Sequence, residues 1–136
     1  MGQSLTFRTK AETLDQLLRQ ANQVHMPKTA LAERYVQEGL AMDQFPGIVF
    51  RSGPAGRRPG LAGGPDVWEV IEVLRSESND LAATAATLGL SAGLVEAAVR
   101  FYAAHQVEID DAINSNRQQL EDAALAYRRE QQLLSR

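Results

Sequence analysis

The first residues of the chain alternate between polar and apolar side chains. Leu5 and Phe7 are apolar, and they alternate with three polar residues, Ser4, Thr6 and Arg8. This is the period of a half-buried β-strand. A strand this short is not stable alone in water, and no nearby segment resembles a partner strand. We therefore expect the same strand of a second copy to pair with it antiparallel across a two-fold axis, which makes the protein a homodimer.

Two amphipathic helices follow. Thr9 and Glu12 have capping-box spacing, which predicts that the first helix begins just after Thr9. Pro27 suits the first turn of the second helix. Apolar residues recur on one face of each helix. They are Leu14, Leu17, Leu18, Ala21 and Val24 in the first helix and Leu31, Ala32, Tyr35, Val36 and Leu40 in the second.

The order strand, helix, turn, helix over Gln3–Met42 resembles the ribbon-helix-helix family of DNA-binding repressors and antitoxins. A two-stranded ribbon has the right width for the DNA major groove. The turn departs from the family's usual glycine and has Val24-His25, although histidine adopts left-handed backbone more readily than most residues. The resemblance implies two sets of DNA-binding residues, which are Ser4, Thr6 and Arg8 for the bases and Lys28 and Thr29, with their backbone amides, for the phosphates.

Arg8 carries most of the expected base specificity. Arginine pairs bidentately with guanine, whereas serine and threonine hydroxyls discriminate bases poorly. The chain has a net charge of −3, but residues 1–60 carry eight Lys or Arg against five Asp or Glu. This distribution permits a focused DNA contact at the N-terminal end and disfavours nonspecific nucleic-acid coating. The alternative is a module that dimerises through the ribbon without binding DNA.

Residues 46–65 are rich in glycine and proline, with six of the ten glycines and four of the five prolines. This composition predicts either a β-hairpin or a flexible linker. Arg51, Arg57 and Arg58 would be available there to phosphate or to an acidic partner. No Gly-Lys-Ser/Thr closes the run, so we do not expect a nucleotide-binding loop.

Residues 66–107 have the pattern of a small helix-turn-helix-like domain. Asp66 and Glu69 have capping-box spacing, which predicts a helix start. Ala85, Gly89 and Val95 have helix-turn-helix spacing. We expect a structural role rather than a second DNA contact, because the outer face of the last helix has no basic or amide side chain. That face is formed by Ser91, Ala92, Gly93 and Glu96.

Residues 46–113 resemble a winged-helix-like domain that is encoded beside PIN-like ribonuclease toxins. The motifs that carry the resemblance are Pro46-Gly47, Gly56-Arg57-Arg58, Val67-Trp68-Glu69-Val70, Leu88-Gly89-Leu90-Ser91 and Tyr102-Ala103-Ala104-His105. The hairpin motif departs from the family's commoner Gly-Thr-Arg form. Both modules on one chain resemble a VapB-type antitoxin, which implies operator DNA and a PIN-like toxin as partners.

A seven-residue repeat of apolar side chains predicts one long amphipathic helix over residues 108–136. The repeat consists of Ile113, Leu120, Tyr127 and Leu134. Three interpretations remain open: a helix that lies across its dimer partner, a toxin-docking tail, or a segment that is disordered in isolation. The resemblance implies that such tails inhibit the toxin and that an arginine reaches its acidic metal site. The candidate toxin-binding residues are therefore Leu120, Tyr127, Arg128, Arg129 and Leu134.

Catalysis has little support in the sequence. His25 and His105 are far apart, no nucleophile motif is present, and His105 with its neighbouring carboxylates fits a helix end better than a metal site. We expect no enzyme, metal, cofactor or small-molecule substrate. No cysteine, transmembrane-length apolar run or signal-peptide core is present, which indicates a cytoplasmic protein without disulfides.

The expected fold is mainly α-helical with a short N-terminal β-strand. It comprises a ribbon-helix-helix module (residues 1–45), a hairpin or linker (46–65), a helix-turn-helix-like domain (66–107) and a long C-terminal helix (108–136). The expected function is an antitoxin that neutralises a PIN-like ribonuclease and represses its own operon. The alternative is a dimeric protein-interaction module that does not bind DNA.

Overall fold

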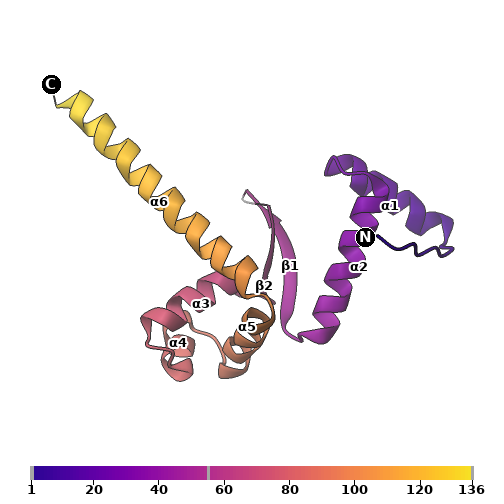
Figure 1. Cartoon of the computed structure of the whole chain (residues 1–136), viewed down its shortest axis with the longest axis horizontal. Coiled ribbons are helices and arrows are strands. Elements are labelled where there is room, and N and C mark those ends of the chain that lie inside the picture. Colours follow the sequence, from indigo (N-terminus) through magenta and orange to yellow (C-terminus); the bar gives the residue numbers. More distant parts are fainter. Residues whose placement is uncertain (1, 55, 136) are drawn as a thin grey trace. The chain divides into compact units, whose positions relative to one another are not determined.

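A computed structural model describes residues 2–54 and 56–135 of the chain. The described residues form six helices and one two-stranded antiparallel sheet, so the fold is mainly helical (Figure 1). The chain divides into two compact units, residues 1–43 and residues 44–136. Within the described residues no single helix is both long and apolar enough to cross a membrane; one bent pair, α4 (Leu81–Leu88) with α5 (Ala92–Ala104), passes by length and composition only.

The first unit consists of an extended segment and two helices, α1 (Ala11–Gln23) and α2 (Lys28–Gln44). His25 has a φ of +56° in the turn between them, which confirms that this residue takes the left-handed conformation in place of a glycine. The N-cap of α1 is Lys10, whose side chain makes no cap hydrogen bond. The predicted capping box at Thr9 and Glu12 is therefore wrong, because the helix begins one residue later than the spacing requires.

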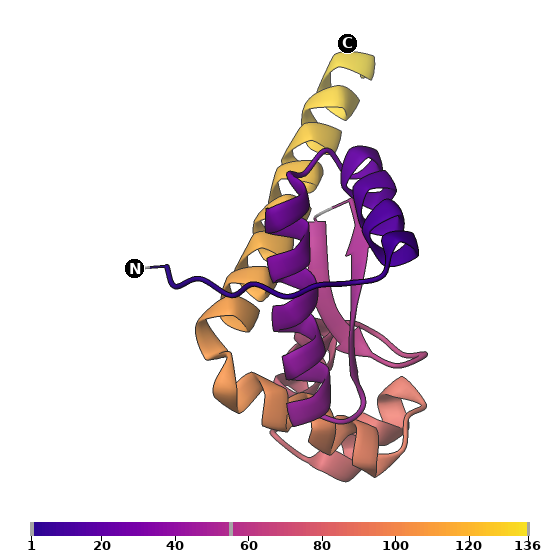
Figure 2. The same ribbon diagram turned by 90° about the vertical axis from the view of Figure 1, so that its right-hand side faces the viewer.

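The N-terminal segment is not a strand in the single chain. Residues 2–10 have no regular secondary structure, and Figure 2 shows them as an irregular trace leading into α1. The two strands that the structure does contain lie in the second unit. The single chain therefore contains no N-terminal strand among its described residues, and the predicted strand, which pairs with a second copy, stays a prediction.

The second unit begins with a β-hairpin, so residues 46–65 are largely ordered rather than a linker. Strands β1 (Ile48–Gly53) and β2 (Gly56–Leu61) pair antiparallel, with Ile48 opposite Leu61 and Arg51 opposite Arg58. Helices α3 (Val67–Ser76) and α5 pack against the hairpin, and α4 packs against α3 and α5. Helix α6 (Gln106–Leu134) extends away from them (Figure 1).

The core of the second unit lies between the hairpin, α3, α5 and the first turns of α6. Phe101 is at its centre, with its ring edge-on to Phe45 and Phe50 and stacked on His105 at a centroid distance of 4.2 Å. The fully buried residues around it are Ile48, Leu61, Val67, Val70, Ile71, Val95, Ala98, Ile109 and Ile113. This single cluster fixes the hairpin and α6 on the helical domain.

Helices α4 and α5 meet at a sharp turn. Asp80 caps α4 by accepting the Ala83 amide at 3.0 Å, and Ser91 caps α5 by accepting the Leu94 amide at 3.3 Å. Gly89 ends α4 with a φ of +67°, a left-handed conformation that costs glycine little. The two helix axes are bent by 113°, which is within the range of helix-turn-helix pairs.

Candidate functional site

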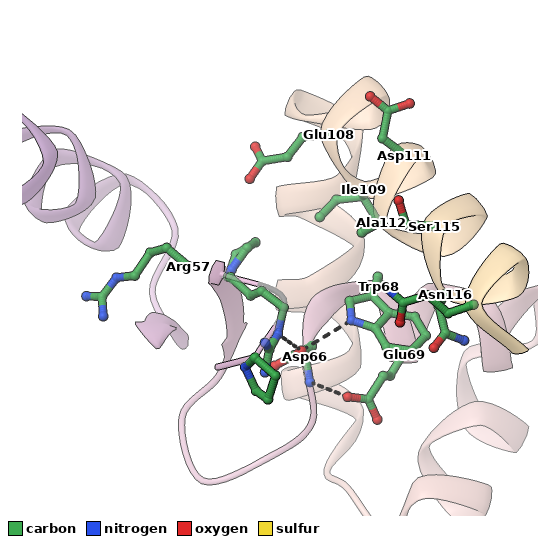
Figure 3. Close-up of a pocket in the computed structure, with 14 residues that line it drawn as sticks. Arg57, Asp66, Trp68, Glu69, Glu108, Ile109, Asp111, Ala112, Ser115 and Asn116 are labelled. Carbon is green, nitrogen blue, oxygen red and sulfur yellow. Dashed lines mark hydrogen bonds and ion pairs between the residues drawn. The ribbon is translucent and has the colours of Figure 1, made fainter. Parts of the chain in front are cut away.

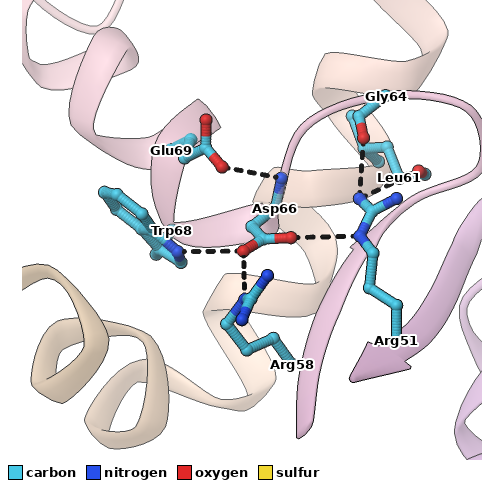
Figure 4. A network of polar contacts seen from close by, with 7 residues as sticks. All are labelled: Arg51, Arg58, Leu61, Gly64, Asp66, Trp68 and Glu69. Carbon is cyan, nitrogen blue, oxygen red and sulfur yellow. Dashed lines mark hydrogen bonds and ion pairs between the residues drawn. The ribbon is translucent and has the colours of Figure 1, made fainter. Parts of the chain in front are cut away.

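A buried carboxylate joins the hairpin to the start of α3. Asp66, the N-cap residue of α3, is only 4% exposed. Its Oδ1 accepts a hydrogen bond from Arg51 Nε at 3.1 Å, and its Oδ2 accepts from Arg58 Nε and from Trp68 Nε1 at 3.2 Å (Figure 4). Both carboxylate oxygens thus have cationic partners, as burial of a charge requires.

The two arginines also fix the backbone around this carboxylate. Arg51 Nη2 donates to the carbonyl oxygens of Gly64 at 2.7 Å and Leu61 at 3.4 Å, which holds the loop between β2 and α3. Each guanidinium crosses a glycine of the opposite strand: a Cβ on Gly60 would overlap Arg51, and one on Gly53 would overlap Arg58. Glycine at these two positions therefore gives the arginines their path to Asp66.

These contacts show a role for Arg51 and Arg58 that the sequence did not reveal. Both side chains are partly buried, and their guanidinium groups form ion pairs with Asp66 inside the domain. Arg57, by contrast, is exposed on β2 and donates to Ser52 Oγ at 3.2 Å. The three arginines were expected to share one role, whereas the structure separates Arg57 from the other two.

Beside this network lies a groove of about 540 Å³ between the hairpin, the start of α3 and the first half of α6 (Figure 3). Trp68 and Glu69 form one wall, and α6 forms the other. The residues that α6 contributes are Glu108, Ile109, Asp111, Ala112, Ser115, Asn116 and Gln119. The groove combines the apolar side chains of Trp68, Ile109 and Ala112 with carboxylates from both walls.

A second polar cluster ties three helices together. Arg75 Nη2 on α3 lies 2.7 Å from both Tyr102 Oη on α5 and Asp110 Oδ1 on α6, and Tyr102 Oη donates to the same carboxylate at 2.8 Å. The hydrogen bonds from Arg75 and Tyr102 hold the pKa of Asp110 below its ordinary value. The carboxylate of Asp110, followed by the phenol of Tyr102, raises the pKa of Arg75.

The predicted DNA-binding residues are all at the surface of the first unit. Ser4, Thr6 and Arg8 are exposed along the extended segment, and Lys28 and Thr29 are exposed in the first turn of α2. The apolar residues between them are also exposed, Leu5 by 76% and Phe7 by 67%. In the single chain both the polar and the apolar side chains of this segment are therefore exposed.

The predicted toxin-binding residues lie on the second half of α6. Leu120, Tyr127 and Leu134 are exposed by 62%, 61% and 78%, and Arg128 and Arg129 are exposed between them. These residues share one helix, but no other element of the described chain covers them. The predicted helix is confirmed, and toxin binding by these residues stays a prediction.

Among the described residues, no group of three or more His, Asp or Glu side chains is placed to hold a metal ion. His105 packs on Phe101, and its Nδ1 lies 3.7 Å from Glu108 Oε2. Comparisons with models of protein families, with curated proteins and with solved structures gave no match to this chain.

Proposed function

We propose that the protein is a dimeric antitoxin. Its N-terminal unit binds operator DNA and represses its own operon, and its C-terminal helix binds and silences a PIN-like ribonuclease. The observation that carries this proposal is the incomplete core of the first unit. Among its described residues, Ala21 and Leu31 are the only buried apolar side chains. A unit of this size with so little core usually needs a second chain to be stable.

A second copy would supply that core and a DNA-binding face together. Pairing of residues 4–8 across a two-fold axis would turn Leu5 and Phe7 of both copies inward. Ser4, Thr6 and Arg8 of both copies would then face outward, which fits contacts to base edges in the major groove. Lys28 and Thr29 occupy a helix N-terminus, where backbone amides favour a phosphate. Such DNA binding is steeply salt-dependent. It would take place in the cytoplasm, where operator DNA is found.

The C-terminal helix supports the second half of the proposal. Leu120, Tyr127 and Leu134 offer apolar anchors at the spacing of a helix that binds in a groove. Arg128 and Arg129 follow Tyr127 in the sequence, and their charges match the carboxylates of a nuclease metal site. The tail is thus able to supply both the anchor and the charge that would occupy such a site.

The test is co-purification with the product of the adjacent gene. Full-length protein should capture a ribonuclease and suppress its activity, whereas Tyr127→Glu should not. Leu125→Glu changes an exposed leucine on the opposite side of α6 and should capture the ribonuclease as the parent does. If the Tyr127 variant and a chain ending at Asn114 both capture the ribonuclease as well as the parent does, the ribonuclease contact lies in residues 44–114 instead of the tail. Capture by none of the proteins would refute the antitoxin proposal and leave a dimeric interaction module.

A further inference from the structure

The second half of α6 carries an apolar stripe that its own chain does not cover. Ile113 is buried in the core, and Leu120, Tyr127 and Leu134 follow it at seven-residue intervals on the same side of the helix. Every described residue from Arg117 onward is exposed. A seven-residue apolar repeat is the pattern of a helix that packs along another helix.

This stripe is symmetric about the bond between Ala123 and Ala124. Leu120 and Tyr127 are equally far from that bond, and so are Ile113 and Leu134. A second α6 that runs in the opposite direction therefore places Leu120 and Tyr127 opposite each other, and Leu134 reaches the edge of the core that already buries Ile113. The two alanines at the centre allow the helix axes to approach closely where they cross.

The charges on α6 favour the antiparallel direction. Gln106–Asp122 contains five carboxylates and one arginine, whereas Ala123–Arg136 contains three arginines and one carboxylate. An antiparallel pair places the acidic half of each helix beside the basic half of the other, and a parallel pair places like charges together. At 100° per residue, Glu121 and Arg128 lie on the same flank of the stripe, so each Glu121 meets Arg128 of the other copy.

The groove beside α6 receives the end of the second helix in this arrangement. Symmetric pairing places Leu133 of one copy opposite Asn114 of the other, next to the groove residues Ser115 and Asn116. Trp68 forms the far wall at this point (Figure 3). An exposed leucine and an aromatic groove wall are thus brought together by the register that the stripe itself sets.

We infer that α6 pairs antiparallel with α6 of a second copy, with Ala123 and Ala124 at the centre and the last turn of each helix in the groove of the other. This inference does not depend on the proposed function. It adds that the stripe is occupied in the free protein, so any other protein that binds the stripe must first displace the second α6.

Disulfide trapping tests this arrangement, because the full-length chain contains no cysteine. Asn116→Cys and Gln131→Cys chains with different tags are co-expressed and mildly oxidised. The symmetric register places these positions opposite each other on the stripe, so a disulfide between the two tagged chains is expected. The matched control is Gln118→Cys with Arg129→Cys, which has the same register on the opposite face of α6 and should give no disulfide.

Two results would overturn the inference. Disulfides between two copies of the Asn116→Cys chain alone would show a parallel pair. No disulfide from either stripe position, with helix content unchanged by circular dichroism, would show that a second α6 does not cover the stripe.

The only tryptophan of the chain gives an independent readout. Leu133→Gln in the full-length protein should shift Trp68 emission to longer wavelength, because water enters the groove that the leucine had filled. Leu125→Gln should leave the emission unchanged, because the same register places Leu125 opposite Asp122, which does not line the groove. The same emission from both variants and the parent would show that the last turn of α6 does not lie in the groove, and would refute this part of the inference.

Discussion

Arg51 Nε lies 3.1 Å from Oδ1 of Asp66, and this ion pair joins the hairpin to the residue that caps α3. Arg58 occupies the other oxygen of the same carboxylate. One acidic side chain thus adds a polar link between the hairpin and the helical domain to the apolar core that they share.

Asp66→Asn should destabilise the second unit, because two partly buried guanidiniums lose their counter-charge. We expect a loss of about 2–4 kcal/mol in the free energy of unfolding, below the range for fully buried pairs since both arginines retain some solvent contact. Urea unfolding followed by circular dichroism measures it. Glu72→Gln, at an exposed site on α3, should change stability by less than about 0.5 kcal/mol. Equal effects of the two substitutions would contradict the importance of Asp66.

Gly60→Ala should act through the same ion pair. The new Cβ would occupy the path of the Arg51 guanidinium and displace it from Asp66. The cost of this substitution should therefore shrink when Asp66 is already asparagine, a non-additivity of about 0.5–3 kcal/mol for groups in contact. A double-mutant cycle by urea unfolding checks this prediction. Gly93→Ala adds a Cβ that meets only Ser91 Oγ at 4.0 Å, and its effect should be additive with Asp66→Asn.

Stability at acid pH should depend on Asp110. Its pKa is lowered in the folded protein, chiefly by the hydrogen bond from Arg75, so the unfolded chain binds this proton more readily. The stabilisation is therefore complete above the unfolded pKa of about 3.9 and is lost as pH falls through the lower folded pKa. Asp110→Asn should flatten the stability profile below about pH 4. Asp111→Asn, its exposed neighbour, should keep the parent slope; identical profiles for all three proteins would exclude this role of Asp110.

Arg8→Ala should weaken operator binding if the proposed ribbon contacts bases. The expected cost is about 1–3 kcal/mol per lost bidentate contact, measured by fluorescence anisotropy on the chain's own upstream DNA. Arg19→Ala removes an exposed arginine of α1 and should have a much smaller effect. Operator binding by the Arg8 variant at parent affinity would favour a ribbon that only dimerises.

The features that the sequence predicted well are local. Asp80, Gly89 and Ser91 mark helix ends through contacts within a few residues, so their roles follow from residue type and spacing. His25 in the turn between α1 and α2 is a similar case. The helix periodicity of α6 was also evident, although the helix begins two residues before Glu108.

The features that it missed depend on long-range or intermolecular contacts. Arg51 and Asp66 are fifteen residues apart, and their pairing depends on the register of a hairpin that composition alone left open. Arg75 and Asp110 are thirty-five residues apart and meet only after three helices pack. The N-terminal strand was predicted from alternation that requires a second chain, so a single chain leaves the same residues irregular.

The length of α6 gives the protein two regimes of stability within one helix. Its first turns are anchored by Ile109 and Ile113, whereas the described turns after Asn116 are held by hydrogen bonds within the helix alone. In one chain these distal turns fray independently of the core, and a protease that recognises arginine meets Arg117, Arg128 and Arg129 first. A protein that covers the distal turns would therefore also protect the chain from proteolysis. The amount of intact chain would then rise with the fraction of distal turns that are covered.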